Sequence, residues 1–566
     1  MTWIRGSTMT THMVTGIGVS PGVAVGRAVV VAPALGVDMA EPKTTDPDAA
    51  VEQIAVALGE VAAGLRKRAA VAPDHAKAVL EAGAMMALDP GLSAGIAARL
   101  RAGKGITLAV WDAAEEFADM FASLGGYMAE RVADLRDVRD RAIARLRGLP
   151  EPGVPTLVVP SILVARDLAP AETAMLTPDT CRGIVTTEGG PTSHTAILAA
   201  QLGIPAVVQA VGLAVADGTV LAVDGSSGVV TINPTMAEQD QLAQRQARRQ
   251  AATGDDSAPG RTADGHPVPL LANIGTIADA ESAATTAVEG VGLFRTEFLF
   301  LDRDDAPTLE EQTATYTRVL QAFPGQRVVV RTLDAGADKP LKFANQDKED
   351  NPALGLRGLR LSMLREHLLD TQLTALAAVG QATQADLQVM APMVSTKADG
   401  DWFAAKAASF GLSKAGAMIE IPAAALRCGN VLTNLHFASL GTNDLQQYAM
   451  GADRLQGGLA RYLSPWEPAL LDLIAIACRQ AGQAGKPIGV CGEAAADPAL
   501  ALVLVGLGVT SLSMAPSRVP AVRAALVRHS LAQCQELAEA ARSFGVAEEA
   551  KRAVLDQADA IVKDLV

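Results

Sequence analysis

A histidine behind a glycine-rich turn is the first position at which residue type and spacing suggest chemistry. His194 follows the residues Gly-Gly-Pro-Thr-Ser at 189–193 and precedes an apolar run that predicts a helix. Ser or Thr directly before such a run is the usual N-cap, so we expect His194 in the first helical turn. Backbone N–H groups at that end attract anions, and glycine lets a phosphate approach the main chain. His194 is therefore a candidate for phosphorylation on a ring nitrogen, and the alternative is a buried histidine in a turn.

Polar residues also stand at the ends of candidate strands in the second half of the chain. Segments with strand character alternate there with helical stretches and cover residues 268–274, 290–295, 327–333, 387–393, 415–420, 437–441, 487–492 and 510–514. This alternation predicts a parallel (β/α)8 barrel, in which the site lies at the C-terminal ends of the strands. Those ends carry Arg295, Arg331, Glu420, Asn443, Asp444 and Cys491. Each one alone is explained as a solvated loop residue, but the set predicts a shared site.

Two arginines and two carboxylates in this set suit an anionic substrate and a metal ion. Arg295 and Arg331 are permanent cations whose planar forks match a phosphate or a carboxylate. Glu420 and Asp444 follow adjacent strands, and we expect them to share one Mg²⁺ with oxygen atoms of the substrate.

Three further candidates are Asn443, Arg454 and Cys491, which could donate a hydrogen bond, close over the substrate and donate a proton. Asn443 can hydrogen-bond a phosphoryl oxygen, and Arg454, ten residues after Asp444, can close over the substrate. Cys491 is placed to give a proton to carbon, and its alternative is an inert buried cysteine. Phosphoenolpyruvate fits these groups, because loss of its phosphoryl group leaves an enolate that Mg²⁺ stabilises and an acid converts to pyruvate.

The composition and periodicity of the sequence change along the chain and indicate the elements that position these residues. A β-like run punctuated by glycine opens the sequence, an alanine-rich helical region follows, and strands return after residue 150. A polar helix and a flexible joint then precede the barrel. We predict a multidomain α/β protein with an N-terminal extension (1–13), a phosphohistidine α/β domain (14–34 and 148–234), an inserted α-helical bundle (35–147), a helical linker with a hinge (235–260) and the barrel (261–566).

Composition restricts the partners and the compartment. With 566 residues, 49% hydrophobic and 19% charged, the chain is long enough for several folded domains and is not disordered. A net charge of −14 without a long basic run argues against nucleic acid or an anionic membrane as a partner. Five cysteines without a CxxC spacing predict neither disulfides nor a zinc site. No apolar run has membrane-spanning length, so we expect a cytoplasmic protein.

Several stretches resemble a known family. The segment 189–197 resembles the phosphohistidine signature of enzymes that exchange phosphoryl groups with phosphoenolpyruvate. Residues 292–300, 331–339, 351–357, 419–424 and 441–448 resemble Enzyme I of the bacterial sugar phosphotransferase system, and so does the opening run with its glycines at 16 and 22. The resemblance runs from about residue 14 to the C-terminus.

This resemblance implies roles for the candidate residues. His194 is expected to take the phosphoryl group of phosphoenolpyruvate and pass it to a histidine of the carrier protein HPr, with release of pyruvate, as the first step of sugar uptake. The matching positions are Arg295, Arg331, Asn443, Asp444 and Arg454 for phosphoenolpyruvate, Glu420 and Asp444 for Mg²⁺, Cys491 as the proton donor, and Thr173 as a hydrogen-bond partner of the histidine.

The same resemblance assigns partners to the domains. The helical bundle corresponds to the subdomain that docks HPr, and the barrel to the part that forms a homodimer. HPr docks through helix–helix contact, so the apolar stripe of Leu80, Ala84, Met85 and Met86 is a candidate surface. The alternative for each of these residues is the core of the bundle.

Two departures from the family pattern lie beside the histidine. The family usually has arginine where this chain has Pro191 and Ala200. Loss of two cations is expected to weaken the electrostatic hold on the phosphate, so that phosphotransfer is slower or the phosphohistidine less stable.

Two other functions remain open at this point. An ATP-dependent pyruvate dikinase or phosphoenolpyruvate synthase shares the histidine signature and the barrel, but it needs a nucleotide-binding domain ahead of the histidine, where this chain has the helical bundle and no P-loop. A non-catalytic sensor of phosphoenolpyruvate or HPr is the second alternative, and the joint presence of His194, Glu420, Asp444 and Cys491 argues against it.

Overall fold

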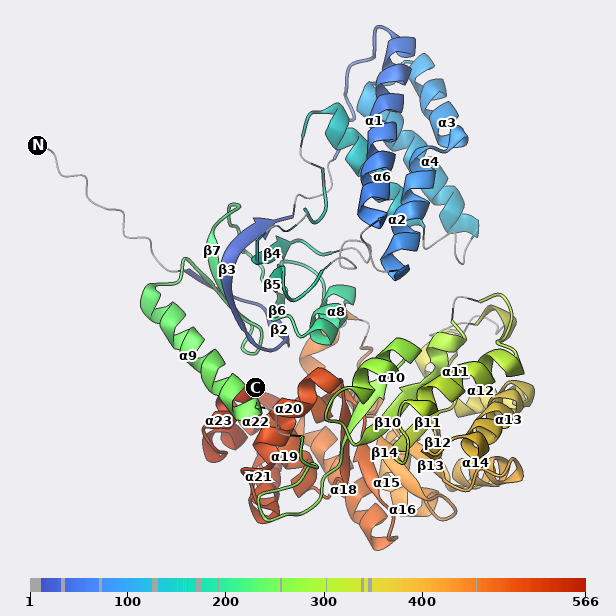
Figure 1. Cartoon of the computed structure of the whole chain (residues 1–566), viewed down its shortest axis with the longest axis vertical. Helices are drawn as coiled ribbons and strands as arrows, with labels where there is room; N and C mark the ends of the chain where they lie inside the picture. Colours follow the sequence, from blue (N-terminus) through green and yellow to red (C-terminus); the bar gives the residue numbers. More distant parts are fainter. Residues whose placement is uncertain are drawn as a thin grey trace, which may run out of the picture. The chain divides into compact units, whose positions relative to one another are not determined.

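The structure of the protein is a computed structural model that divides into two compact units between residues 243 and 244 (Figure 1). It describes residues 12–31, 36–70, 74–124, 131–149, 151–155, 157, 159–168, 176–190, 193–254, 257–301, 303–336, 341–344, 349–454 and 456–566. Each unit is considered by itself below. No helix in these ranges is both long enough and apolar enough to cross a bilayer.

The first unit contains a mixed sheet. Its strands are β1 (His12–Thr15), β2 (Ile17–Ser20), β3 (Val23–Val30), β4 (Ser161–Ala165), β5 (Cys181–Thr186), β6 (Ala206–Val208), β7 (Val220–Asp224) and β8 (Val229–Ile232). Within the described ranges they lie in the order β1-β8-β7-β3-β4-β5-β6-β2. Strands β3 to β6 run parallel, and the other pairs are antiparallel. The sheet thus joins the opening run to the strands after residue 160, as the sequence predicts.

Glycines bring the two edges of this sheet together. Strands β1 and β2 stand at opposite ends of the strand order, yet only Gly16 separates them in the chain. The N–H of Gly16 donates to the carbonyl of Gly228 at 2.8 Å. A Cβ atom at Gly16 would clash with the carbonyl oxygen of Val208, and one at Gly225 with that of Ser20. Only glycine allows these backbones to approach so closely.

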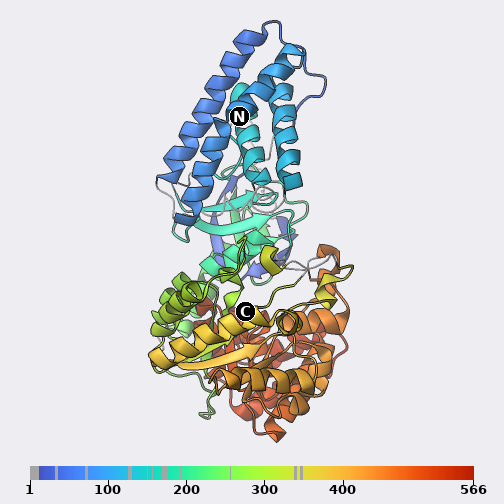
Figure 2. The ribbon, with the colours of Figure 1, turned by 90° about the vertical axis from the view of Figure 1, so that its right-hand side faces the viewer.

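The helices of the first unit form a bundle that Figure 2 shows running side by side. They are α1 (Pro47–Ala69), α2 (Asp74–Ala87), α3 (Pro90–Arg101), α4 (Ile106–Leu124) and α6 (Val132–Leu146). Asp46 and Asp89 cap α1 and α3 with their carboxylates, each followed by proline at the first helical position. Leu80 and Ala84 lie in the core of the bundle, whereas Met85 is 66% exposed. Of the proposed docking stripe, Leu80 and Ala84 are therefore core residues, and Met85 remains a candidate surface residue.

The second unit confirms the predicted barrel. Its strands are β9 (Leu270–Ile274), β10 (Gly290–Arg295), β11 (Arg327–Arg331), β12 (Asp386–Ala391), β13 (Ala415–Ile419), β14 (Phe437–Leu440), β15 (Ile488–Val490) and β16 (Ser511–Met514). They pair in parallel in chain order, and β16 closes onto β9. Each lies within one or two residues of its predicted range. Buried Val, Ile, Leu and Ala from strands and helices form one continuous core.

Helices surround the barrel strands in Figure 1. The longer ones are α10 (Ile277–Ala284), α11 (Leu309–Gln321), α13 (Glu366–Ala382), α14 (Lys397–Ser409), α17 (Thr442–Met450), α18 (Pro468–Gln483), α19 (Pro498–Gly506), α20 (Val519–Leu526), α21 (Leu531–Arg542) and α22 (Ala547–Gln557). The shorter ones are α12 (Leu359–Leu364), α15 (Pro422–Leu426), α16 (Cys428–Val431) and α23 (Ile561–Leu565). Capping boxes begin α10, α11, α14 and α21.

The predicted linker is a helix, α9 (Met236–Thr253), that buries none of its residues. Its second half belongs to the barrel unit, where Arg248 Nε donates to Asp564 Oδ2 at 2.7 Å and Arg245 donates to the carbonyl of Lys563 at 3.1 Å. The C-terminal part of the helix is thus attached to the barrel by charged contacts, and Ala252 also packs against the barrel core. The hinge after it and the exact domain boundaries stay predictions.

Candidate active site

The histidine stretch forms the helix start that the sequence predicts. Helix α8 (His194–Leu202) has Ser193 as its N-cap, and the Ser193 hydroxyl accepts a hydrogen bond from the N–H of Ala196 at 3.3 Å. His194 is the first helical residue, but its side chain lies outside the part that the structure describes. Thr173 and Pro191 also lie outside the described residues, so their predicted roles stay predictions.

An aspartate that the sequence analysis did not single out holds this helix start. The Thr195 side chain is fully buried, and its hydroxyl donates to Asp167 Oδ1 at 3.1 Å. Asp167 follows β4, and Gly189, with φ +81°, follows the parallel neighbour β5 and lies against the Asp167 carboxylate. The helix therefore begins above the carboxyl ends of two parallel strands, the usual place for a ligand in such sheets. Asp167 could have been found from the sequence, because it is an acidic residue shortly after the predicted strand 161–164.

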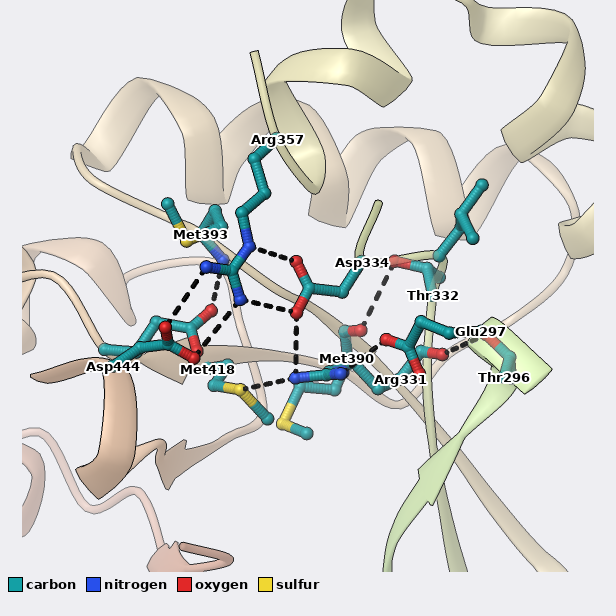
Figure 3. A network of polar contacts seen from close by, with 12 residues as sticks. Thr296, Glu297, Arg331, Thr332, Asp334, Arg357, Met390, Met393, Met418 and Asp444 are labelled. Atoms are coloured by element: carbon teal, nitrogen blue, oxygen red, sulfur yellow. Dashed lines mark hydrogen bonds and ion pairs between the residues drawn. The ribbon is translucent and has the colours of Figure 1, made fainter. Parts of the chain in front are cut away.

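At the C-terminal end of the barrel strands, the guanidinium of Arg331 is already paired with carboxylates of the protein (Figure 3). Arg331 ends β11 and forms ion pairs with Glu297 and, at 3.2 Å, with Asp334. It is 7% exposed, and its neighbouring acids raise the pKa of its guanidinium although burial opposes this. The sequence predicts instead that the Arg331 guanidinium is available to the substrate. The structure leaves only its Nε, which is buried without a partner among the described residues.

A second buried arginine, Arg357, links the acids of the site and was missed as a site residue. Its guanidinium donates to Asp334 at 3.0 Å and to Asp444 at 3.1 and 3.2 Å, as Figure 3 shows. Arg357 is 1% exposed, and Asp334 is fully buried. Both lie in segments that resemble the family, at 331–339 and 351–357. Neither residue stands at the end of a strand, so the search for polar residues at strand ends did not identify them.

The carboxylates of Glu420 and Asp444 lie where the metal was predicted. They follow the neighbouring parallel strands β13 and β14. Glu420 Oε1 accepts the N–H of Met393 at 2.6 Å, while Oε2 is buried without a partner among the described residues. Burial, and then the charges of Asp444 and Asp334, raise the pKa of Glu420. An unpartnered oxygen beside a second carboxylate fits a hard divalent cation such as Mg²⁺. The described residues hold no cluster of three or more acid, histidine or cysteine ligands, so other oxygens must complete such a site.

The remaining predicted substrate contacts are more accessible. Arg295 ends β10, is partly exposed, and pairs with no acid among the described residues. Arg454 lies 3.8 Å from Asp444 Oδ2. Asn443 Oδ1 accepts the N–H of Glu493 at 3.1 Å, which leaves the amide NH₂ group of Asn443 to donate elsewhere.

Cys491 directly follows β15 and is 2% exposed. Its thiol donates to the carbonyl oxygen of Leu440 at 3.6 Å. Burial raises the pKa of Cys491, and the charge of Arg331 opposes this. The group is therefore a protonated thiol at neutral pH, surrounded by the charges of the site. The other cysteines are also buried and unpaired, which agrees with their assignment as inert core residues.

Three buried polar atoms without partners converge on this end of the barrel. They are Arg331 Nε, Glu420 Oε2 and Thr442 Oγ1. Unsatisfied buried groups are rare in folded proteins because each costs about 1–3 kcal/mol. One N–H donor, one carboxyl oxygen and one hydroxyl are left for a ligand, and they suit a ligand with charged oxygen atoms together with a cation.

Three family models match the chain in succession. The N-terminal model of the PEP-utilising enzymes covers residues 15–131, the mobile-domain model residues 158–228, and the PEP-binding-domain model residues 249–531. The mobile-domain match contains His194, and the PEP-binding match contains every predicted barrel site residue.

Curated relatives match over nearly the whole chain. A phosphoenolpyruvate-protein phosphotransferase of Streptomyces coelicolor is 52% identical over 95% of this chain and 98% of its own length. One of Haloferax volcanii is 38% identical over 94% of this chain and 97% of its own. A multiphosphoryl transfer protein of Xanthomonas campestris is 36% identical over 95% of this chain and 66% of its own.

Proposed function

Because the chain belongs to the phosphoenolpyruvate-protein phosphotransferases, the Enzyme I members of the PEP-utilising enzymes, we propose the following reaction for it. The phosphoryl group of phosphoenolpyruvate passes to His194 and then to a histidine of a small HPr-type carrier, and pyruvate is released. The family itself supports phosphoenolpyruvate-dependent phosphotransfer. The structural observation that carries the site assignment is the convergence of Arg331 Nε, Glu420 Oε2 and Thr442 Oγ1, all buried without partners in the described part of the chain.

Substrate binding is assigned to cations at the rim of the buried network. Arg295 and Arg454 are partly exposed, so they can reach a phosphate or a carboxylate without leaving a buried acid unpaired. The NH₂ group of Asn443 offers a further donor. Arg331 and Arg357 instead fix the acids of the site, and Arg331 adds its Nε as a donor. Phosphoryl transfer mainly requires such positioning and charge neutralisation.

Mg²⁺ is proposed as the cofactor. Glu420 and Asp444 would hold it, and when bound it supplies charge neutralisation for phosphoryl and enolate oxygens. Arg357 keeps the Asp444 carboxylate in place through two hydrogen bonds, and the N–H of Met393 keeps the Glu420 carboxylate in place through one. The chain thus orients both carboxylates before a metal ion or substrate binds.

Cys491 completes the reaction as the acid. When the bond between phosphorus and the enol oxygen breaks, the phosphoryl group goes to a ring nitrogen of His194 and the electron pair stays on oxygen. The enolate carbon then takes the proton of the Cys491 thiol, which burial keeps protonated at neutral pH.

Partners and setting are part of the proposal. The helical bundle is assigned to HPr docking, with Met85 as an exposed apolar candidate, and the barrel to a homodimer in the cytoplasm. An ATP-dependent dikinase is the second candidate function, because it shares the histidine signature. The match of phosphotransferases along more than nine-tenths of the chain favours the first.

Mass spectrometry tests the proposal. The full chain is incubated with phosphoenolpyruvate and Mg²⁺, or with ATP and Mg²⁺, and mapped by intact mass and peptide analysis, with H194A as the control. We expect an acid-labile phosphoryl group on His194 from phosphoenolpyruvate alone, discharged by an added HPr. Labelling from ATP would favour the dikinase, and no labelling from either would favour a sensor.

A further inference from the structure

A cavity of about 220 Å³ opens at the end of the barrel opposite to the candidate active site. Its mouth lies where the strands begin, because Arg327 starts β11, and Lys414 and His436 directly precede β13 and β14. The candidate active-site residues of the barrel instead lie at or after the ends of their strands. The cavity is therefore a separate feature, and none of the described residues assigned to the reaction lines it.

Small residues on the inner face of the barrel leave this space open. The interior of such a barrel is usually filled by bulky, branched side chains. Here the lining of the cavity includes Gly292 of β10, Ser439 of β14, Gly489 of β15, and Ser511 and Ser513 of β16. The strands around it pair into a closed barrel, so the space comes from these small side chains and not from a gap between strands.

The rest of the inner wall is largely apolar. Leu271, Val329 and Phe437 line the cavity, and the last two belong to a buried cluster of side chains inside the barrel. In another protein, a dry cavity of about 150 Å³ with an apolar wall takes up benzene. The present cavity is larger, so it has room for an apolar body of that size and for a small polar group beside it.

The charged groups at the mouth favour an anion. The described lining contains the basic residues Arg327, Lys414 and His436 and no acidic residue. Lys414 Nζ is paired with Asp386 Oδ1 at 2.6 Å, whereas Arg327 pairs with no acid among the described residues. Arg327 is also partly buried. A guanidinium in such a place, without a carboxylate of the protein, suits the carboxylate or phosphate of a ligand.

A buried hydroxyl at the same level of the barrel also lacks a partner. Ser511 begins β16, is 7% exposed and lines the cavity. Its hydroxyl forms no hydrogen bond within the described part of the chain, whereas the hydroxyl of Ser513, further along the strand, donates to Asn273 Oδ1 at 2.7 Å. Ser511 therefore offers a free donor to an oxygen atom that enters the cavity.

We propose that this cavity binds a small organic carboxylate whose apolar body is about the size of a benzene ring. The carboxylate accepts hydrogen bonds from Arg327 and Ser511, and the body packs against Leu271, Val329 and Phe437. An inorganic anion would leave the apolar wall uncovered, and a neutral apolar molecule would leave the guanidinium unpaired. The site does not depend on the proposed reaction, because it lies at the other end of the barrel.

Benzoate is the probe for this site. The full-length protein is labelled in its Leu and Val methyl groups, and NMR follows the methyl signals of Leu271, Val329 and Val490 as benzoate is added. We expect saturable shifts with a Kd of about 1 mM or below, which is within reach of so small a ligand. Benzamide has the same shape without the charge, and sulfate has charge without the apolar body. Each should bind about tenfold more weakly than benzoate.

Matched variants locate the bound benzoate. R327Q should weaken its binding about tenfold and R327K less, because lysine keeps the charge. S511V removes the hydroxyl and narrows the cavity, so it should also weaken binding. R295Q changes an arginine at the opposite end of the same barrel and should leave the affinity unchanged. Methyl signals away from the cavity that match the wild type show that each variant is folded.

Three outcomes would overturn the proposal. The first is that the methyl signals of the cavity show no saturable shift in the wild type. The second is that R327Q and S511V bind benzoate as well as the wild type does. The third is that R295Q weakens binding and R327Q does not, which would place benzoate in the candidate active site.

Discussion

The two candidate sites of this chain are built in opposite ways. The His194 region uses backbone: a capped helix start, a glycine at φ +81° and one buried hydroxyl, that of Thr195, bonded to Asp167. The barrel end uses charge: two buried arginines that share a set of buried acids. In the proposed reaction the histidine exchanges phosphoryl groups with two partners and needs open donors, whereas the barrel site would hold an anion and a cation together and needs its charges fixed in advance.

Breaking the charged region should have the largest effect. R357A leaves the carboxylates of Asp334 and Asp444 buried without their main cation, which costs about 3–5 kcal/mol in comparable buried pairs. We expect lower unfolding stability and loss of phosphoenolpyruvate binding, measured by urea denaturation and calorimetry. R357K keeps the charge without the fork and should fall between R357A and the wild type.

A matched change near the histidine makes the contrast quantitative. Arg166 and Glu188 form a bidentate pair at 3.0 and 3.2 Å, but their side chains are 69% and 56% exposed. R166A should therefore change stability by less than about 1 kcal/mol. If R166A and R357A cost the same, the distinction between the two regions would be wrong.

Alkaline pH should destabilise the two units to different extents, which is the next largest effect. Burial raises the pKa of Cys181 in the sheet to about 11, and it also raises the pKa values of Cys428, Cys478 and Cys534 in the barrel unit. Because the folded pKa values are raised, the thiols contribute stability below about pH 8.5 and lose it as the pH rises toward the folded values. At pH 9 this is about 1 kcal/mol for the sheet and roughly 2–3 kcal/mol for the barrel.

Cysteine-resolved alkylation along a urea gradient at pH 7 and pH 9, under reducing conditions, measures this difference for each unit. The urea midpoint of the barrel cysteines should move further than that of Cys181. In C428A, C478A and C534A the barrel shift should shrink stepwise. Equal shifts in both units at pH 9 would contradict the prediction.

The hydroxyl beneath the histidine tests the backbone-built region. T195V removes the donor to Asp167 and should cost roughly 1–2 kcal/mol locally, because the carboxylate loses a buried partner. Hydrogen exchange should show faster opening of α8, and phosphorylation of His194 should slow, while barrel binding of phosphoenolpyruvate stays normal. T195S keeps the hydroxyl and should retain the protection of α8.

The smallest expected effect concerns the departure from the family at Ala200, which lies half-buried in α8. If the missing cation weakens the hold on the phosphate, A200R should lengthen the lifetime of the phosphohistidine about two- to fivefold, as expected for one partly exposed charge pair. A200Q, similar in length without charge, should not. An unchanged lifetime in A200R would remove the hypothesis.

Local patterns predicted more than long-range ones. The barrel strands and the helix start at His194 were predictable, because β-branched runs and an N-cap serine act within a few residues. The positions of Glu420 and Asp444 were predictable because each residue shortly follows a strand that the local sequence pattern indicates. Arg357 was not, since its pairing with Asp334 and Asp444 depends on how two long loops meet. The saturation of Arg331 by Glu297 was hidden for the same reason.

The single residue between β1 and β2 has a consequence for how the first unit folds. The segment 12–20 contributes both outermost strands of the sheet, and their partners are β8 and β6, about two hundred residues later in the chain. The sheet therefore cannot be completed until the chain through residue 232 is available, whereas the intervening helices make mostly local contacts and can assemble earlier. Gly16, the one residue between these two strands, should therefore reach its final position late in folding.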